Sequence, residues 1–89
     1  ITISGAGMSP RLQDGDIAVV NMADTELKDG KVFLINYRGQ AVIKRISHDF
    51  GRWYMNSDNS GRKQYAREEF SKAHCVIIGK VIVLVSEQV

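Results

Sequence analysis

The stretch KVFLINYRGQAVIKRIS, residues 31–47, has the pattern of a β-hairpin. Two runs rich in Val, Ile, Phe and Tyr lie on either side of Arg38-Gly39, and residues of these types favour strands. A two-residue connection that ends in glycine is typical of the tight turn between antiparallel strands. The segment therefore predicts strands at 31–37 and 40–47, paired with each other in an antiparallel sheet.

The rest of the chain repeats this pattern of short apolar runs separated by Gly, Asp and Asn, which is typical of an all-β domain. Residues 75–85 form either a strand pair or one long strand, bent or bulged at Gly79. Further strands are predicted at 1–4, 17–21 and 52–56. Residues 23–28 form one helical turn or a loop, and 66–72 a short helix. Loops or turns are predicted at 5–11, 14–16, 49–51 and 57–63.

Composition predicts one small globular domain over residues 1–89, because 44% of the 89 residues are hydrophobic and 25% are charged. A domain of this size buries a modest share of its surface, so we expect it to gain stability by association. The net charge of +2 is too small to indicate a nucleic-acid surface. The chain opens on Ile1 rather than Met, so we expect it to be part of a longer protein.

The single cysteine, Cys75, excludes an internal disulfide, and together with two histidines it offers no zinc-binding spacing. His74 and Cys75 are neighbours that would point to opposite faces of a strand, which argues against a catalytic pair. We therefore expect no metal and no cofactor. The longest apolar run, 76–85, is too short to span a bilayer, and no membrane partner is expected.

Lys44 is the residue of the hairpin with the most chemical interest. Side chains alternate along a strand, so Lys44 shares a face with Val42 and Ile46. Two interpretations stay open. In the first, this face is exposed and the ammonium group reaches water. In the second, the lysine is desolvated, and burial lowers the pKa of a lysine toward the range in which it acts as a general base.

Several motifs, taken in order, resemble those of the LexA-like peptidases, a family that includes lambdoid phage repressors and mutagenesis proteins. Gly5-Ala6-Gly7-Met8-Ser9-Pro10, followed by Leu12 and Asp14-Gly15-Asp16, is similar to the family's Gly-x-Ser-Met-x-Pro signature with its Leu and Asp-Gly-Asp. The later matches are Lys28 to Phe33, Val42-Ile43-Lys44-Arg45, Ser57-Asp58-Asn59 with Tyr65, and Ile78-Gly79-Lys80-Val81. The resemblance implies a small β-barrel or β-clip-type fold like that of LexA and signal peptidase, with at most one or two short helical turns.

In that family a serine–lysine dyad cleaves the protein's own chain: the lysine accepts the serine proton and the serine attacks a peptide bond in a linker. The resemblance puts the lysine at Lys44 and the serine at Gly7, which has no side chain. We therefore expect no autocleavage and no enzyme activity. Either the natural protein lacks autocleavage, which we favour, or glycine replaces a native serine that would make the chain an active autopeptidase.

The resemblance implies a second role, the self-association of repressor subunits into dimers or larger oligomers. We expect Val81, Val83 and Val85, on one face of the last strand, and the aromatic Trp53 to contribute to this contact, although a core position is the alternative for each. Operator DNA would be bound by an N-terminal domain outside this chain. A bacteriophage lysogeny repressor would act in the cytoplasm of its bacterial host, and an antirepressor protein is a further expected partner.

Two other classes of function compete with this reading. A serine–lysine peptidase or a relative of signal peptidase needs the nucleophile that Gly7 lacks. A generic β-barrel binding module would share the turn motif only by coincidence, and it would have no reason to direct Lys44 toward position 7.

Overall fold

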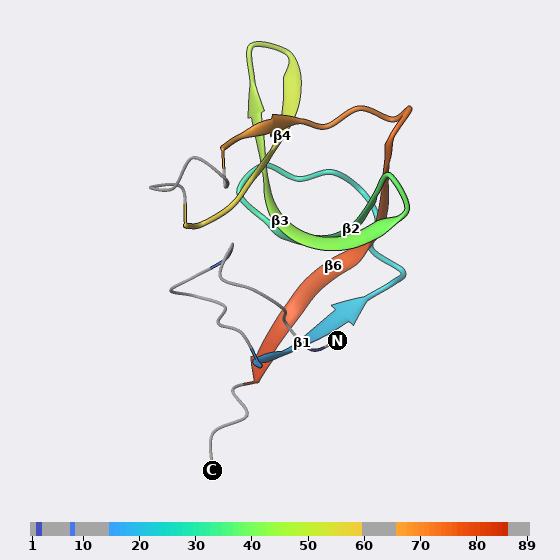
Figure 1. Cartoon of the computed structure of the whole chain (residues 1–89), viewed down its shortest axis with the longest axis vertical. Coiled ribbons are helices and arrows are strands. Elements are labelled where there is room, and N and C mark those ends of the chain that lie inside the picture. Colours follow the sequence, from blue (N-terminus) through green and yellow to red (C-terminus); the bar gives the residue numbers. More distant parts are fainter. Residues whose placement is uncertain (1, 3–7, 9–14, 60–65, 86–89) are drawn as a thin grey trace.

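One antiparallel sheet contains most of the residues that the structure describes (Figure 1). The structure is a computed structural model, and it describes residues 2, 8, 15–59 and 66–85. The sheet has six strands in the order β1-β6-β2-β3-β4-β5. Their bounds are β1 Ile17–Asn21, β2 Val32–Tyr37, β3 Gln40–Asp49, β4 Arg52–Asn56, β5 Glu68–Glu69 and β6 Cys75–Val85.

The expected all-β fold is confirmed, although the sheet of the described residues is open and does not close into a barrel. Those residues contain no helix, and hence none long and apolar enough to cross a membrane.

The hairpin of β2 and β3 forms as predicted. Tyr37 pairs with Gln40, and the two residues between them, Arg38 and Gly39, have φ of 51° and 85°. Positive φ at both central residues defines the type I′ turn, whose twist matches that of the strands it joins. The returning strand runs two residues further than expected, to Asp49.

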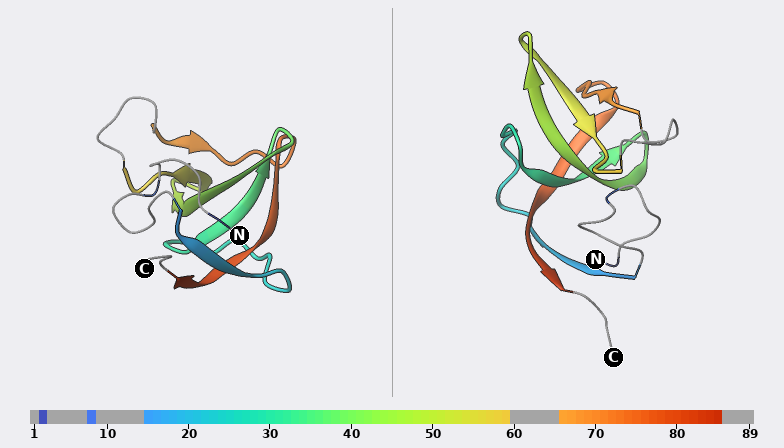
Figure 2. Two further views of the ribbon diagram at one scale, coloured as in Figure 1. Left: turned by 60° about the horizontal axis from the view of Figure 1, so that its bottom comes forward. Right: turned by 90° about the vertical axis from the view of Figure 1, so that its left-hand side faces the viewer.

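The two long strands, β3 and β6, each pair with one neighbour over their first half and with another over their second half. β3 pairs with β2 over residues 40–45 and with β4 over residues 45–49. β6 pairs with β2 over residues 75–80 and with β1 over residues 80–85. Figure 2 shows the result: β6 runs past β2 to β1, while β3 and β4 extend beyond β2 as a protruding hairpin. Of the two possibilities for residues 75–85, a strand pair or one long strand, the structure has one long strand.

Two apolar clusters lie against the sheet, and β2 contributes to both. Phe33 and Ile35 belong to the larger cluster, while Val32 packs against the smaller one. Alternate residues of β2 thus face different clusters, as expected for a central strand covered on both sides. The larger cluster consists of Phe33, Ile35, Ile46, Met55 and Cys75. The smaller consists of Met8 and Ala18, with Val32, Ile43 and Val81 packed against them.

The predicted short helix at 66–72 is wrong. Glu68 and Glu69 form β5 and pair with Met55 and Tyr54 of β4, and the amide of Phe70 donates to the carbonyl of Trp53 at 2.8 Å. A helix of this length gains few hydrogen bonds for its nucleation cost, whereas the open edge of β4 offers partners directly. Residues 23–28 form a loop rather than a helical turn.

The other predicted loops and the first strand extend partly outside the described residues. Thr2 does form an isolated antiparallel bridge with Ile17, as a strand at 1–4 would require. Residues 57–59 form a loop as predicted.

Gly79 marks a bulge in β6, as its sequence context predicts. The register with β2 shifts there, because Leu34 pairs with Gly79 while Ile35 pairs with Ile77. A Cβ on Gly79 would lie 2.6 Å from the backbone oxygen of Asn21 and 2.7 Å from Cγ1 of Val20. The missing side chain therefore allows β1 to approach β6 closely.

We predict that Gly79→Ala lowers the free energy of unfolding by about 1–3 kcal/mol, the range for overpacking a tight contact. Urea denaturation would measure it. The nearest atom is backbone, so the loss should persist in a Val20→Ala background, where one of the two clashes is removed. Disappearance of the loss in that background would contradict the backbone contact as its cause.

Candidate functional site around Lys44

The candidate site begins with the hydrogen bond that the Lys44 ammonium Nζ donates to the hydroxyl Oγ of Ser57, at 2.7 Å. Lys44 lies in the middle of β3, on the same face as Val42 and Ile46, which both pack in or against the larger cluster. Its side chain is half-buried, and Ser57 is only 4% exposed. The lysine therefore does not reach into open water as the first interpretation of its pattern required.

Ser57 owes its position to β4, which ends at Asn56, the residue before it. The side-chain amide of Asn56 donates to the carbonyl of Arg45 at 3.2 Å and to the hydroxyl of Ser47 at 2.7 Å. The end of β4 is thus held against β3 by a side chain as well as by the strand ladder. The hydrogen bonds of Asn56 thus place the next residue, Ser57, beside the ammonium group of Lys44.

Arg45 holds the same loop from the other face of β3. Its guanidinium donates from Nε to Oδ1 of Asp58 at 2.9 Å and from NH2 to Oδ2 at 3.0 Å. A third donor, NH1, binds the carbonyl oxygen of Gly30 at 2.8 Å. The hydrogen bond with Asp58 raises the pKa of Arg45 above its ordinary value, against the smaller opposing effect of burial. Two consecutive residues of β3, Lys44 and Arg45, therefore bind two consecutive residues of the loop, Ser57 and Asp58.

A pocket of about 290 Å³ opens beside Lys44. It is lined by Tyr37, Gln40, Val42, Lys44, Met55 and Glu68. Its walls combine apolar surface with one cationic and one anionic side chain. Among the described residues, no three His, Cys, Asp or Glu side chains come close enough together to hold a metal ion.

The expected nucleophile position, Gly7, lies outside the described residues, and so does most of its loop. Met8, the next residue, is described and buried, and Ile43, the residue before Lys44, packs against its cluster. The residue after Gly7 and the residue before Lys44 thus both belong to or pack against the smaller apolar cluster. Whether Lys44 faces position 7 stays a prediction.

The predicted self-association residues occupy different surroundings. Trp53 packs against the larger core cluster and stacks on the ring of His48, with centroids 4.3 Å apart. Val81 packs against the smaller cluster. Val83 and Val85 pair with Val19 and Ile17 in the ladder to β1, and their side chains lie outside the described part of the chain. Their role in association stays a prediction.

The site thus places a lysine against a buried serine in an all-β sheet, beside a small pocket. A family model described as Peptidase S24-like matches residues 1–82, and the chain belongs to this family. No curated protein matches the chain.

Sequence reasoning identified Lys44 but neither its hydrogen-bond partner nor the role of its neighbour. The signal was present in two pairs of adjacent residues: Lys44-Arg45 on one strand, and Ser57-Asp58 directly after another. What the sequence lacked was the register of β3 with β4, which pairs Arg45 with Asn56 and so brings the two pairs together.

We predict that Arg45→Lys lowers the free energy of unfolding by about 1–2 kcal/mol, because one ammonium group cannot bind both oxygens of Asp58 and the Gly30 carbonyl together. Arg52→Lys is the matched control. The side chain of Arg52 is 69% exposed, and its NH1 lies 3.7 Å from Oε2 of Glu69. The substitution Arg52→Lys should therefore change the free energy of unfolding by less than about 0.5 kcal/mol in the same urea titration. Equal effects at both positions would show that the bidentate contact contributes nothing special.

A second prediction concerns chemistry. Gly7→Ser should cleave an added linker peptide at alkaline pH, where a lysine is more often neutral and able to accept the serine proton. Gly7→Ala and the double variant Gly7→Ser/Lys44→Ala should both be inactive. Cleavage that survives loss of Lys44, or an inactive Gly7→Ser protein with native stability, would contradict the assignment of positions 7 and 44.

Proposed function

We propose that this chain is the self-association domain of a phage or bacterial transcriptional repressor, and that it no longer cleaves itself. Membership of the S24-like family supports a domain of the LexA type. Gly7 supports the loss of cleavage, because glycine offers no hydroxyl at the position to which the resemblance assigns the nucleophile. The domain keeps its binding role while the chemistry is gone.

The observation that carries this proposal is the apolar surface at the β1–β6 end of the sheet. Val19 in β1 is 42% exposed, Ile82 in β6 is 53% exposed, and Met22, just after β1, is 71% exposed. β1 is also an edge strand, whose outer side forms a bridge with Thr2 at Ile17. An edge strand with exposed apolar side chains favours pairing with a second chain.

Association of this kind has a direct use in a repressor. Each subunit would carry a DNA-binding domain on its N-terminal side, and tethering two such domains makes the second operator contact intramolecular. The gain in avidity reaches about 10²- to 10⁴-fold without any new contact to DNA. The partners in this proposal are a second copy of the chain, operator DNA bound through the N-terminal domain, and an antirepressor that relieves repression. All of them act in the cytoplasm of the bacterial host.

A second candidate, a serine–lysine autopeptidase, is favoured by one contact. The 2.7 Å between Lys44 Nζ and Ser57 Oγ lies within the distance at which a lysine activates a serine. Ser57 is 4% exposed, however, and a peptide bond cannot reach a hydroxyl so deeply buried. This candidate therefore needs a serine at position 7, with Ser57 positioning the lysine.

We predict that sedimentation equilibrium of the chain over a wide concentration range shows reversible dimers or larger species. A charge on β6, at the exposed Ile82 or at the predicted association residues Val83 and Val85, should weaken them by about tenfold or more. The variants are Ile82→Asp, Val83→Asp and Val85→Asp. Ala41→Asp, at an exposed position of β3, is the control that adds the same charge elsewhere.

A strict monomer at high concentration would remove self-association as the function. Unchanged association in all three variants would move the interface away from β6. Circular dichroism of each variant shows whether the fold is retained.

A further inference from the structure

The hairpin of β3 and β4 carries an aromatic ring at its tip in an unfavourable conformation. Phe50 has a φ of 50°, in the left-handed region, and Gly51 follows with 75°. Bulky side chains rarely adopt this region, and asparagine is the residue that usually precedes glycine in such a turn. Phe50 is also 94% exposed, so its ring is almost entirely open to solvent. The tip thus bears both backbone strain and an unburied aromatic side chain.

The hairpin behind this tip is held by several contacts. His48 and Trp53 stack across its two strands, and the guanidinium of Arg67 lies 3.9 Å from the centre of the Tyr54 ring. The backbone amide of His48 donates to Oδ1 of Asp29 at 3.0 Å, which holds the hairpin against the turn before β2. A ring presented on a braced support loses little conformational freedom on binding, and this favours an anchoring role.

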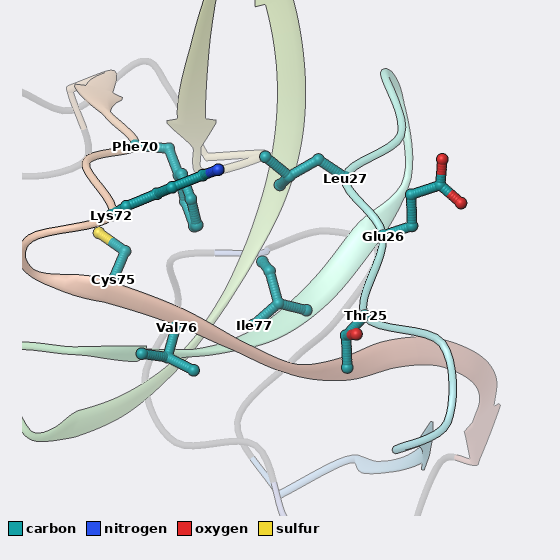
Figure 3. A pocket seen from close by; sticks show the side chains of 8 residues that line it. All are labelled: Thr25, Glu26, Leu27, Phe70, Lys72, Cys75, Val76 and Ile77. Carbon is teal, nitrogen blue, oxygen red and sulfur yellow. The ribbon is translucent and has the colours of Figure 1, made fainter.

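A second pocket on the molecule has apolar walls that could receive such a ring. It has a volume of about 430 Å³ and lies between the loop at 25–27 and the segment at 70–77 (Figure 3). Leu27, Phe70 and Ile77 line it, and all three pack against the larger core cluster. A ring that enters this pocket would extend the hydrophobic core of the domain. Val76, on its rim, is 63% exposed.

The charges around the tip complement those around the pocket. Asp49 and Arg52 face each other across the hairpin on either side of Phe50. In Figure 3, Lys72 lies on one side of the pocket and Glu26 on the opposite side. Asp49 also pairs with Arg67 at 3.5 Å, and Arg52 with Glu69 at 3.7 Å. These are exposed ion pairs of little energetic weight, and they leave both side chains available to a second partner.

From this combination we infer that the Phe50 hairpin of one copy docks into the Leu27–Phe70–Ile77 pocket of another. Asp49 then meets Lys72, and Arg52 meets Glu26. The contact joins two different surfaces of the same chain, so it is heterologous and each copy offers one hairpin and one pocket. It uses none of the β1–β6 surface. The two contacts together would join dimers into larger assemblies.

The test uses two variants that each remove one half of the contact. Phe50→Asn removes the ring and relaxes the turn, so its unfolding midpoint should rise, by roughly 5 °C, while the contact weakens about thirtyfold. Val76→Asp places a charge on the pocket rim at an exposed position, and the contact should weaken to a similar degree. Ala41→Asp is the control for added charge.

Sedimentation velocity at one total concentration compares wild type, each variant alone and an equal mixture of the two variants. The expected result is fewer large species for each variant alone and their recovery in the mixture, because the Val76→Asp protein supplies hairpins and the Phe50→Asn protein supplies pockets. Association of either variant equal to wild type, or a mixture that associates no better than its components, would overturn the proposal, as would a monomeric wild type.

Failure of this contact and failure of the β1–β6 dimer are distinguishable. Phe50→Asn should leave the dimer intact, whereas Val83→Asp should leave the hairpin contact intact. If Val83→Asp alone removes all association, the heterologous contact is absent.

Discussion

The guanidinium of Arg45 ties together three parts of the molecule that are separate in sequence. It sits at the residue where β3 leaves β2 and begins to pair with β4. From there it binds the loop after β4 through Asp58 and the turn before β2 through the carbonyl of Gly30. Its hydrogen bond with Asp58 raises the pKa of Arg45 further above physiological pH, so the cation persists under all ordinary conditions. The placement of Ser57, and with it the orientation of Lys44, depends on this contact.

The hydrogen bond between Lys44 and Ser57 has a structural role that does not depend on catalysis. Lys44 donates a hydrogen bond to the buried hydroxyl of Ser57, and removal of the lysine would leave that buried hydroxyl without this partner. Under the proposed assignment of the nucleophile to position 7, the lysine would persist after loss of the serine, because its contact with Ser57 has a structural role.

Local pattern was enough to predict the strands, because Val, Ile and aromatic residues alternate with polar ones and glycine marks the turns. β1 and β4 begin and end where expected, and the Arg38-Gly39 turn has the predicted backbone. The pattern failed where pairing between distant segments decides the conformation. Glu68 and Glu69 form a strand only because β4 has a free edge, and Ser57 enters the site only because Arg45 pairs with Asn56. Neither relation is visible in the residues next to them.

The pairing of β1 with β6 also has a consequence for how the domain forms. Ile17 pairs with Val85, so the backbone groups of β1 can form their ladder hydrogen bonds only after β6 is present. Contacts between opposite ends of a chain slow folding, because the intervening segment loses conformational freedom before the contact stabilises it. On the ribosome, β2, β3 and β4 can pair as they emerge, while β1 lacks its ladder partner until β6 has been synthesised. During that interval its apolar side chains and backbone groups lack the partners that β6 provides, which favours aggregation of the partly folded chain.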